Sequence, residues 1–185
     1  MVNNPQLTKI KQLLEDKFIP QNQQLVEEVG VDDNGDAFVM QRKVGSSRSV
    51  DYFICRFDPN NNSKFFPYFK QIEGLHKICD YIIFAENSDS IFVFLVELKK
   101  GAGSPQHQLD ISEPFVDFII NRAAAIDITL DKTIQKRKIG IKDRVSSKKS
   151  TQFYKDLKFD NNRYVLCQGE RQLYIDALID APIDA

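Results

Sequence analysis

The chain has 185 residues and a net charge of −1, with 42% apolar and 28% charged residues. This composition is that of an ordinary globular protein, and it excludes a fibrous or an intrinsically disordered chain. A chain of this length buries about 70% of its unfolded surface, which is enough for a proper core. The near-neutral charge also argues against tight, non-specific binding of nucleic acid by the whole surface.

The sequence has no targeting or membrane signal that we can identify. No unbroken apolar run follows the first charges, and no later segment has the roughly 18 apolar residues that a membrane span needs. We therefore expect a cytoplasmic protein that does not bind membranes. Cys55, Cys79 and Cys167 are odd in number, far apart and never in a CxxC pair, so we expect core thiols rather than disulfides or a zinc knuckle.

The first third of the chain predicts one helix and two strands. Apolar residues recur at helical spacing over residues 5–18, and Pro20 ends this helix. Residues 36–44 and 49–57 are strand candidates, and the second is rich in aromatic and β-branched side chains. The Asn-rich stretch 58–64 is expected to be a loop between elements.

The middle of the chain predicts a β-hairpin. Residues 77–84 and 91–100 are two apolar runs, and the polar stretch 85–90 separates them. Both runs are apolar at consecutive positions, which is typical of strands in the middle of a sheet that is covered on both faces. We therefore expect these two strands to lie at the centre of the sheet.

A helical region follows the hairpin. Pro105 could occupy the first position of a helix that Ser104 caps, and Ser112 with Glu113 offers a second start. We expect either one kinked helix or a pair of helices.

The last third predicts short strands at residues 137–143 and 163–168, and residues 172–179 are expected to pair with the second of these. No linker or repeat divides the sequence. The order of elements predicts a single α/β domain over residues 1–185, with a central mixed β-sheet flanked by helices.

Charged residues at the end of the predicted hairpin are the strongest functional signal. Asp80 lies in one apolar strand, while Glu97 and Lys99 share one face of the next, about 6.6 Å apart. Two neighbouring carboxylates repel each other unless a cation lies between them, and hard divalent cations prefer oxygen ligands. We therefore predict a Mg²⁺ or Mn²⁺ site formed by Asp80, Glu97 and the backbone carbonyl of Leu98. Lys99 would orient or deprotonate a water and offset charge on a phosphoryl group.

The pattern of Asp80, sixteen residues, and then Glu97-Leu98-Lys99 resembles the PD-(D/E)xK nuclease superfamily, which has the restriction-endonuclease-like fold. The proline that can precede the Asp is replaced by Cys79. The resemblance implies that the two acids bind the metal, that the lysine assists the attacking water, and that the core spans about residues 75–168. Family members often have a glutamine in the following helix, and Gln108 is the candidate for this catalytic position.

The resemblance also implies an upstream glutamate. Glu15, Glu27, Glu28 and Glu73 are the candidates, and we favour Glu28 or Glu15. A second Glu-x-Lys triplet, Glu15-Asp16-Lys17, lies on the predicted N-terminal helix and is expected to be surface charge.

Histidine ligands receive little support from the sequence. Some metal-dependent RNA endonucleases with this fold use a His, but His76 lies about 13 Å from Asp80 in a regular strand and could reach the metal only if the chain bends. His107 is expected on the surface of a helix. A zinc site formed by His76, Cys79 and His107 fits no usual spacing, and Cys79 is expected on the face opposite Asp80.

A basic run could supply contacts to nucleic acid. Eight Lys and Arg residues stand against one acid between Lys132 and Lys149. The alternative is a solvated strand and loop surface, which is what charge runs usually are. The residues that we predict to contact phosphate are Lys136, Lys138, Lys142, Arg144, Lys148 and Lys149.

The sequence thus predicts a Mg²⁺- or Mn²⁺-dependent endonuclease that hydrolyses phosphodiester bonds, in DNA more than in RNA. A homodimer or a partner protein could help such a small protein hold its substrate. One alternative is an inactive module with the nuclease fold that binds nucleic acid or a protein. Another is a structural protein in which the acids and Lys99 only pair with each other.

Overall fold

The fold is taken from a computed structural model. It describes residues 5–32, 34–48, 50–57, 70, 72, 75–101, 103–143 and 154–184. The helices are α1 (Pro5–Gln12), the 3-10 helix η1 (Asp16–Phe18), α2 (Gln106–Ala124) and α4 (Ile175–Asp180). The strands are β1 (Leu25–Val31), β2 (Ala37–Gly45), β3 (Asp51–Cys55), β4 (Tyr81–Glu86), β5 (Ser90–Lys99), β6 (Thr133–Lys142), β7 (Tyr164–Gln168) and β8 (Gln172–Tyr174).

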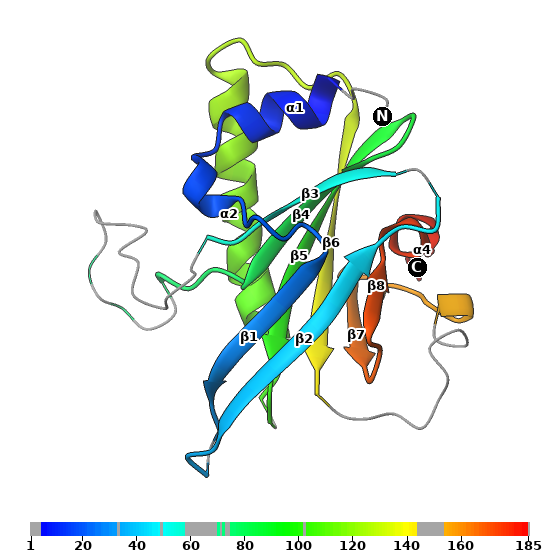
Figure 1. Cartoon of the computed structure of the whole chain (residues 1–185). Helices are drawn as coiled ribbons and strands as arrows, with labels where there is room; N and C mark the ends of the chain where they lie inside the picture. Colours follow the sequence, from blue (N-terminus) through cyan, green and yellow to red (C-terminus); the bar gives the residue numbers. More distant parts are fainter. Residues whose placement is uncertain are drawn as a thin grey trace.

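The strands form two mixed sheets in an α/β arrangement (Figure 1). The larger sheet has the order β3-β4-β5-β6-β7. Its first two pairs are antiparallel, and its last two pairs are parallel. Helix α2 connects the parallel strands β5 and β6, as a crossover of this kind requires. The smaller sheet has the order β1-β2-β8.

The predicted hairpin is confirmed. Strands β4 and β5 pair antiparallel from Tyr81–Val96 to Glu86–Ile91, and both lie inside the larger sheet. Every residue of β4 is buried, and in β5 only Lys99 is partly exposed. The consecutive apolar positions therefore indicated central strands correctly.

Alternate residues of these two strands belong to two separate cores. On one face, Ile82, Phe84, Val93 and Leu95 pack with apolar residues of α1 and α2. On the other face, apolar residues of the same two strands pack with the small sheet and α4. The larger sheet is thus covered on both sides, by helices on one face and by the second sheet with α4 on the other.

The predictions missed strand β1 and hence the second sheet. In "LVEEVGV" the valines at 29 and 31 are 65% and 66% exposed, whereas Glu28 shares a face with the buried Val26. Apolar residues point outward and an acid points inward, so the alternation that identifies a half-buried strand is lost. Residues 5–18 form α1 followed by η1, rather than one helix.

The expected pairing of residues 172–179 with 163–168 is wrong. Residues Gln172–Tyr174 pair parallel with the end of β2, and the chain then turns into α4. Ile175 and Leu178 are three residues apart and fully buried, which is helical spacing. The carboxyl group of Asp176 accepts a hydrogen bond from the backbone N–H of Ser47, and this holds α4 beside the end of β2.

The region after β5 forms one helix, α2, with Pro114 inside it. The helix begins at Gln106, so Pro105 occupies the N-cap position and not the first helical position that we predicted. Ser104 Oγ accepts a weak hydrogen bond from the backbone N–H of Gln106. In the described part of the chain, no helix is both long enough and apolar enough to cross a membrane.

Candidate carboxylate site at the ends of β4 and β5

The two acids of the motif meet where β4 begins and β5 ends. The last pair of the hairpin is Tyr81–Val96, so Asp80 follows on directly opposite Glu97. The backbone N–H of Asp80 donates to Glu97 Oε2 at 3.2 Å, and the backbone N–H of Leu98 donates to Asp80 Oδ2 at 2.7 Å. Each carboxyl group therefore accepts a backbone N–H from the other strand, and the two groups lie side by side.

The backbone carbonyl of Leu98 lies on the same side of β5 as its N–H group. The N–H and C=O groups of one strand residue point in the same direction, and the N–H of Leu98 points at Asp80. Strand β4 has no paired residue at this level, because its ladder with β5 stops at Tyr81. The carbonyl oxygen thus lies on the β4 side of β5, beyond the last ladder pair of the two strands.

Glu28 joins the two acids from the small sheet. Its carboxyl group interacts electrostatically with Asp80, Glu97 and Lys99. Its Oε2 atom is buried and has no hydrogen-bond partner among the described residues. Of the upstream glutamates considered from the sequence, Glu28 is thus the one that the structure brings to the motif.

Burial dominates the electrostatics of this cluster. Burial, followed by the neighbouring charge of Asp80, raises the pKa of Glu28 to about 7. The same two causes raise the pKa of Glu97. Burial also raises the pKa of Asp80, although the Leu98 N–H and the charge of Arg56 oppose it. Burial thus disfavours the ionised form of all three carboxyl groups, and the positive charges nearby do not offset it.

Two cations stand near the cluster. Lys99 has the same parity as Glu97 in β5, and its charge lowers the pKa of all three acids. Its aliphatic chain lies beside Gly103 in the loop after β5: Lys99 Cε is 3.2 Å from the place that a Cβ atom on Gly103 would occupy. Arg56 follows β3, lies over the Tyr81 ring at 5.4 Å, and lowers the pKa of Asp80.

Helix α2 fixes the segment that leads into Asp80. The side-chain amide of Gln108 donates to the carbonyl of Ile78 at 2.9 Å. The fully buried hydroxyl of Ser112 accepts the N–H of Cys79 at 2.7 Å and donates to the carbonyl of Gln108. Gln108, which we predicted as a catalytic residue, therefore anchors backbone two residues before Asp80.

The other upstream glutamates lie elsewhere. Glu15 is exposed and pairs with Lys17 at 2.6 Å, which confirms the second Glu-x-Lys triplet as surface charge. The carboxyl group of Glu27 accepts a hydrogen bond from Gln41 on the exposed side of the small sheet. Glu73 lies outside the described residues.

The two histidines stand apart from the carboxyl cluster. The His76 imidazole lies 3.0 Å from the carbonyl of Lys70, and His107 is exposed on α2. Cys79 is buried, and burial raises the pKa of its thiol. In the part of the chain that the structure covers, no three His, Cys, Asp or Glu side chains stand so as to enclose a metal ion.

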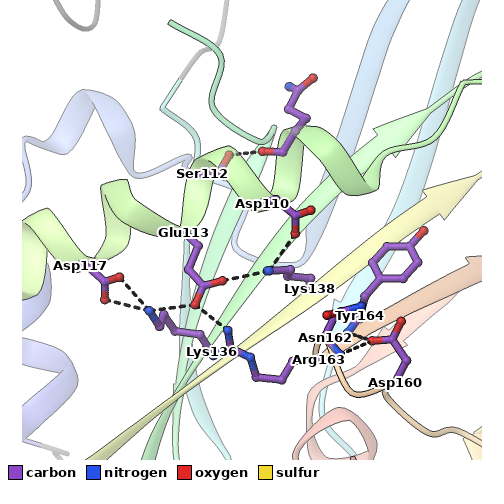
Figure 2. A network of polar contacts seen from close by, with 11 residues as sticks. Asp110, Ser112, Glu113, Asp117, Lys136, Lys138, Asp160, Asn162, Arg163 and Tyr164 are labelled. Carbon is purple, nitrogen blue, oxygen red and sulfur yellow. Dashed lines mark hydrogen bonds and ion pairs between the residues drawn. The ribbon is translucent and has the colours of Figure 1, made fainter. Parts of the chain in front are cut away.

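Half of the basic residues between positions 132 and 149 form contacts within the fold. Figure 2 shows Lys136 and Lys138 of β6 contacting the carboxylates of α2. Lys136 lies 2.8 Å from Asp117 and 2.9 Å from Glu113. Lys138 lies 2.8 Å from Asp110 and 2.9 Å from Glu113, and it is 7% exposed. The prediction that these two lysines contact phosphate therefore receives no support.

Two more residues of the run are engaged inside the molecule. Lys132 pairs with the buried Glu86 at 2.6 Å. The buried guanidinium of Arg137 donates to the carbonyls of Leu178 and Ala181.

Lys142 ends β6 directly beside Lys99 of β5, at the same end of the sheet as the carboxyl cluster. The remaining predicted contacts, Arg144, Lys148 and Lys149, lie outside the described residues.

A cavity of about 400 Å³ lies at another place, between η1 and α2. Its lining is mainly apolar, with Phe18, Phe57 and Phe115 among its residues, and its charged lining residues are Glu15 and Arg122. It contains none of the motif acids, so the chemistry of the carboxyl cluster does not extend into it.

Sequence reasoning missed two residues of the site, Arg56 and Tyr81. Arg56 ends the apolar run of β3, and Tyr81 follows Asp80 directly. A cation and a phenol at the ends of apolar strands are the signals that could have identified them, since buried polar groups need partners.

Comparisons of the chain with models of protein families, with curated proteins and with solved structures found no match. A functional assignment therefore depends on the geometry and electrostatics of the carboxyl cluster.

Proposed function

We propose that the protein is a metal-dependent endonuclease that hydrolyses phosphodiester bonds in nucleic acid, with DNA as the preferred substrate. The observation that carries the proposal is the cluster of Glu28, Asp80 and Glu97 beside Lys99. Glu97 is buried and Glu28 and Asp80 are partly buried, and carboxyl groups with pKa values raised in this way are costly to keep ionised without a cation. Clusters of this kind occur preferentially at functional sites.

The donor atoms suit a hard divalent cation. Three carboxyl groups and the Leu98 carbonyl supply only oxygen, which Mg²⁺ and Mn²⁺ prefer. The buried Oε2 atom of Glu28 has no hydrogen-bond partner in the described part of the chain, so it can serve as a ligand. When bound, Mg²⁺ or Mn²⁺ would supply Lewis-acid chemistry, which lowers the pKa of a water and stabilises phosphoryl charge.

The residues of the chain have separate roles in this proposal. Glu28, Asp80 and Glu97 hold the cation and must be ionised to do so. Lys99 provides a compact positive charge that orients the attacking water and offsets charge that develops on the phosphoryl group. Arg56 supplies a planar guanidinium on the Asp80 side of the cluster, where it can contact a phosphate oxygen.

A second candidate is a module with the same fold that binds nucleic acid or a protein without cleaving. It is favoured by one observation. As the described side chains stand, no three acidic, His or Cys residues enclose a metal ion. In this case the carboxyl cluster would not function as a catalytic metal site.

A cleavage assay with matched variants tests the proposal. Plasmid DNA, linear double-stranded DNA, single-stranded DNA and single-stranded RNA are incubated with the protein and Mg²⁺ or Mn²⁺, with EDTA as a blank. Glu97→Gln and Lys99→Ala should abolish cleavage. Glu15→Gln and Lys17→Ala change the same residue types in the exposed triplet and should leave it unchanged.

The outcomes separate the candidates. Metal-dependent cleavage that both site variants remove supports the nuclease, and the relative rates decide between DNA and RNA. Thermal stabilisation by Mn²⁺ without cleavage of any substrate favours the binding module. Neither stabilisation nor cleavage would leave the acids and Lys99 as a structural ion-pair group.

A further inference from the structure

Tyr81 links the two sheets beside the carboxyl cluster. It is the first residue of β4, follows Asp80 directly, and is 2% exposed. Its hydroxyl accepts a hydrogen bond from the backbone N–H of Glu27 at 3.1 Å and donates one to the carbonyl of Glu27 at 2.9 Å. One side-chain oxygen thus holds both backbone polar groups of a residue in β1.

This pair of hydrogen bonds fixes the orientation of β1 at Glu27. Together with the ladder between β1 and β2, holding both the N–H and the C=O limits rotation of the strand about its axis at that position. Successive side chains of a strand point to opposite faces, so Glu28 must point away from the side on which Glu27 contacts Gln41. The orientation of Glu27 therefore determines where the Glu28 carboxyl group lies.

The position of the β1 backbone matters for Glu28, because no described group forms a hydrogen bond with its Oε2 atom. Its Oε2 atom is buried and has no hydrogen-bond partner in the described part of the chain. Glu28 also comes from the small sheet, whereas Asp80 and Glu97 come from the β4–β5 hairpin. A connection between the two sheets at this level is needed to bring the three acids together.

We propose that the Tyr81 hydroxyl is a positioning group that places Glu28 beside Asp80 and Glu97, and so completes the cation site. This inference rests on the proposed function, because it takes Glu28 to be a ligand. Tyr81 acts through the backbone of Glu27 and does not touch the metal. Groups that orient metal ligands in this way change metal affinity about 10- to 100-fold when they are removed.

The variant Tyr81→Phe isolates the hydroxyl. The ring remains, and with it the packing in the core and the contact with the Arg56 guanidinium. Tyr52→Phe is the matched control. The Tyr52 hydroxyl also joins the two sheets, since it donates from β3 to the carbonyl of Val44 in β2 at 3.2 Å. Tyr52 pairs with Ala85 of β4, five residues along the chain from Asp80.

The experiment measures the dissociation constant of Mn²⁺ by thermal-shift titration or calorimetry, with the melting temperature of each metal-free variant recorded alongside. We expect Tyr81→Phe to weaken Mn²⁺ binding about 10- to 100-fold. Glu28→Gln should weaken it at least as much, and the double variant should lose little beyond Glu28→Gln because both changes remove one ligand. Tyr52→Phe should keep the wild-type dissociation constant even where its melting temperature falls.

Wild-type affinity in a folded Tyr81→Phe protein would overturn the inference while leaving the proposed function in place. An equal loss of affinity in Tyr52→Phe would also overturn it, because the effect would then be general loosening. A wild-type protein that binds no Mn²⁺ would reject the proposed function, and the inference with it. Should Tyr81→Phe not fold, Glu28→Asp withdraws the carboxyl group by one methylene from the same backbone position. Undiminished Mn²⁺ affinity in that variant would overturn the inference as well.

Discussion

Two clusters of carboxyl groups in this fold show opposite electrostatics. On the surface of α2, Glu113 lies within 2.9 Å of Lys136, Lys138 and Arg163 (Figure 2). Partial burial acts to raise its pKa, but hydrogen bonds from these three cations lower it to about 2. At the ends of β4 and β5, burial and mutual repulsion instead raise the pKa values of Glu28 and Glu97.

The two clusters therefore differ in how well their negative charge is matched by positive charge within the fold. The cluster around Glu113 has three cations and three carboxylates, because Lys136 and Lys138 also pair with Asp117 and Asp110. Its contacts are therefore complete, and they hold α2 against β6. The carboxyl groups around Glu97 have Lys99 and Arg56 nearby, and burial still dominates their pKa values. A group that is complete in the folded protein is structural, whereas one that lacks positive charge has room for a cation from solution.

The largest expected difference between the clusters is in catalysis. Glu97→Gln should reduce Mg²⁺-dependent cleavage at least about 100-fold, because it removes a ligand and a charge from the site. Lys99→Ala should have a similar effect, and the double variant should cost little more, since the residues act as a unit. Initial rates on the best substrate measure this.

Glu113→Gln serves as the comparison, because it changes the same residue type in the compensated cluster. Its rate should stay within a few-fold of wild type at a temperature where the variant is folded. Equal losses from Glu97→Gln and Glu113→Gln would show that the two clusters do not differ in function.

The two substitutions should affect stability in the opposite order to activity, with the larger loss in Glu113→Gln. Glu113→Gln leaves Lys136, Lys138 and Arg163 without their shared partner, and should lower the free energy of unfolding by about 2 to 3 kcal/mol. This is below the range for a fully buried pair because the Glu113 side chain is 15% exposed. Glu97→Gln should instead stabilise the metal-free protein at pH values above the raised pKa of Glu97, because only there does it remove a buried and repelled charge.

Urea unfolding in EDTA measures both changes. Glu15→Gln, in an exposed ion pair, should alter the free energy of unfolding by less than about 0.5 kcal/mol. A destabilised Glu97→Gln protein would mean that the carboxylate already has the positive charge that it needs within the fold.

The contributions of the two clusters to folding stability should depend on pH in opposite directions. The folded-state pKa of Glu28 is about 7 against an ordinary value of 4.5. Its contribution to stability is therefore present below pH 4.5 and is lost as pH rises through about 7. The folded-state pKa of Glu113 is about 2, so its contribution is present above pH 4.5 and is lost as pH falls through about 2.

Unfolding of wild type, Glu28→Gln and Glu113→Gln across this range tests both signs. Relative to wild type, Glu28→Gln should gain stability as pH rises from 4.5 to about 8, and Glu113→Gln should lose its deficit as pH falls toward 2. Mn²⁺ affinity of the wild type should also increase through about pH 7, because the ligands must lose their protons to bind. Parallel curves for the two variants would contradict the comparison.

The sequence was most informative where the strands are central. The consecutive apolar residues of β4 and β5 predicted both the hairpin and its place in the sheet, because strands buried on both faces have no polar side. Strand parity then predicted that Asp80 and Glu97 would meet. Pairings between strands that lie far apart in the sequence were harder to predict. The partner of β8 is β2, more than 100 residues earlier, and no local pattern specifies it.

Side chains that make long-range contacts also escaped prediction. Lys136 and Lys138 are separated from Asp117 and Asp110 by 19 and 28 residues, so their pairing depends on how α2 crosses β6. A run of basic residues indicates charge but not which face carries it. Glu28 was one of four candidates for the same reason, since spacing alone cannot show that β1 packs against the end of β4.

The smallest expected effect is on nucleic-acid affinity, and it concerns the basic run between residues 132 and 149. It tests whether lysines of this run that do not pair with α2 contact nucleic acid. Lys136 and Lys138 are neutralised by acids within the fold, so any attraction for nucleic acid must come from other residues of the run. Lys148 and Lys149 are the sequence-based candidates, in a chain whose net charge is −1. Replacing both with Ala should weaken binding on all sequences alike, and should flatten the dependence of log affinity on log salt by up to about two phosphate contacts. Lys11→Ala with Lys17→Ala removes the same charge from the N-terminal region and should leave the slope unchanged. Affinity for a labelled duplex across a salt series decides it, and equal slopes in the two double variants would mean that only the overall charge of the protein matters.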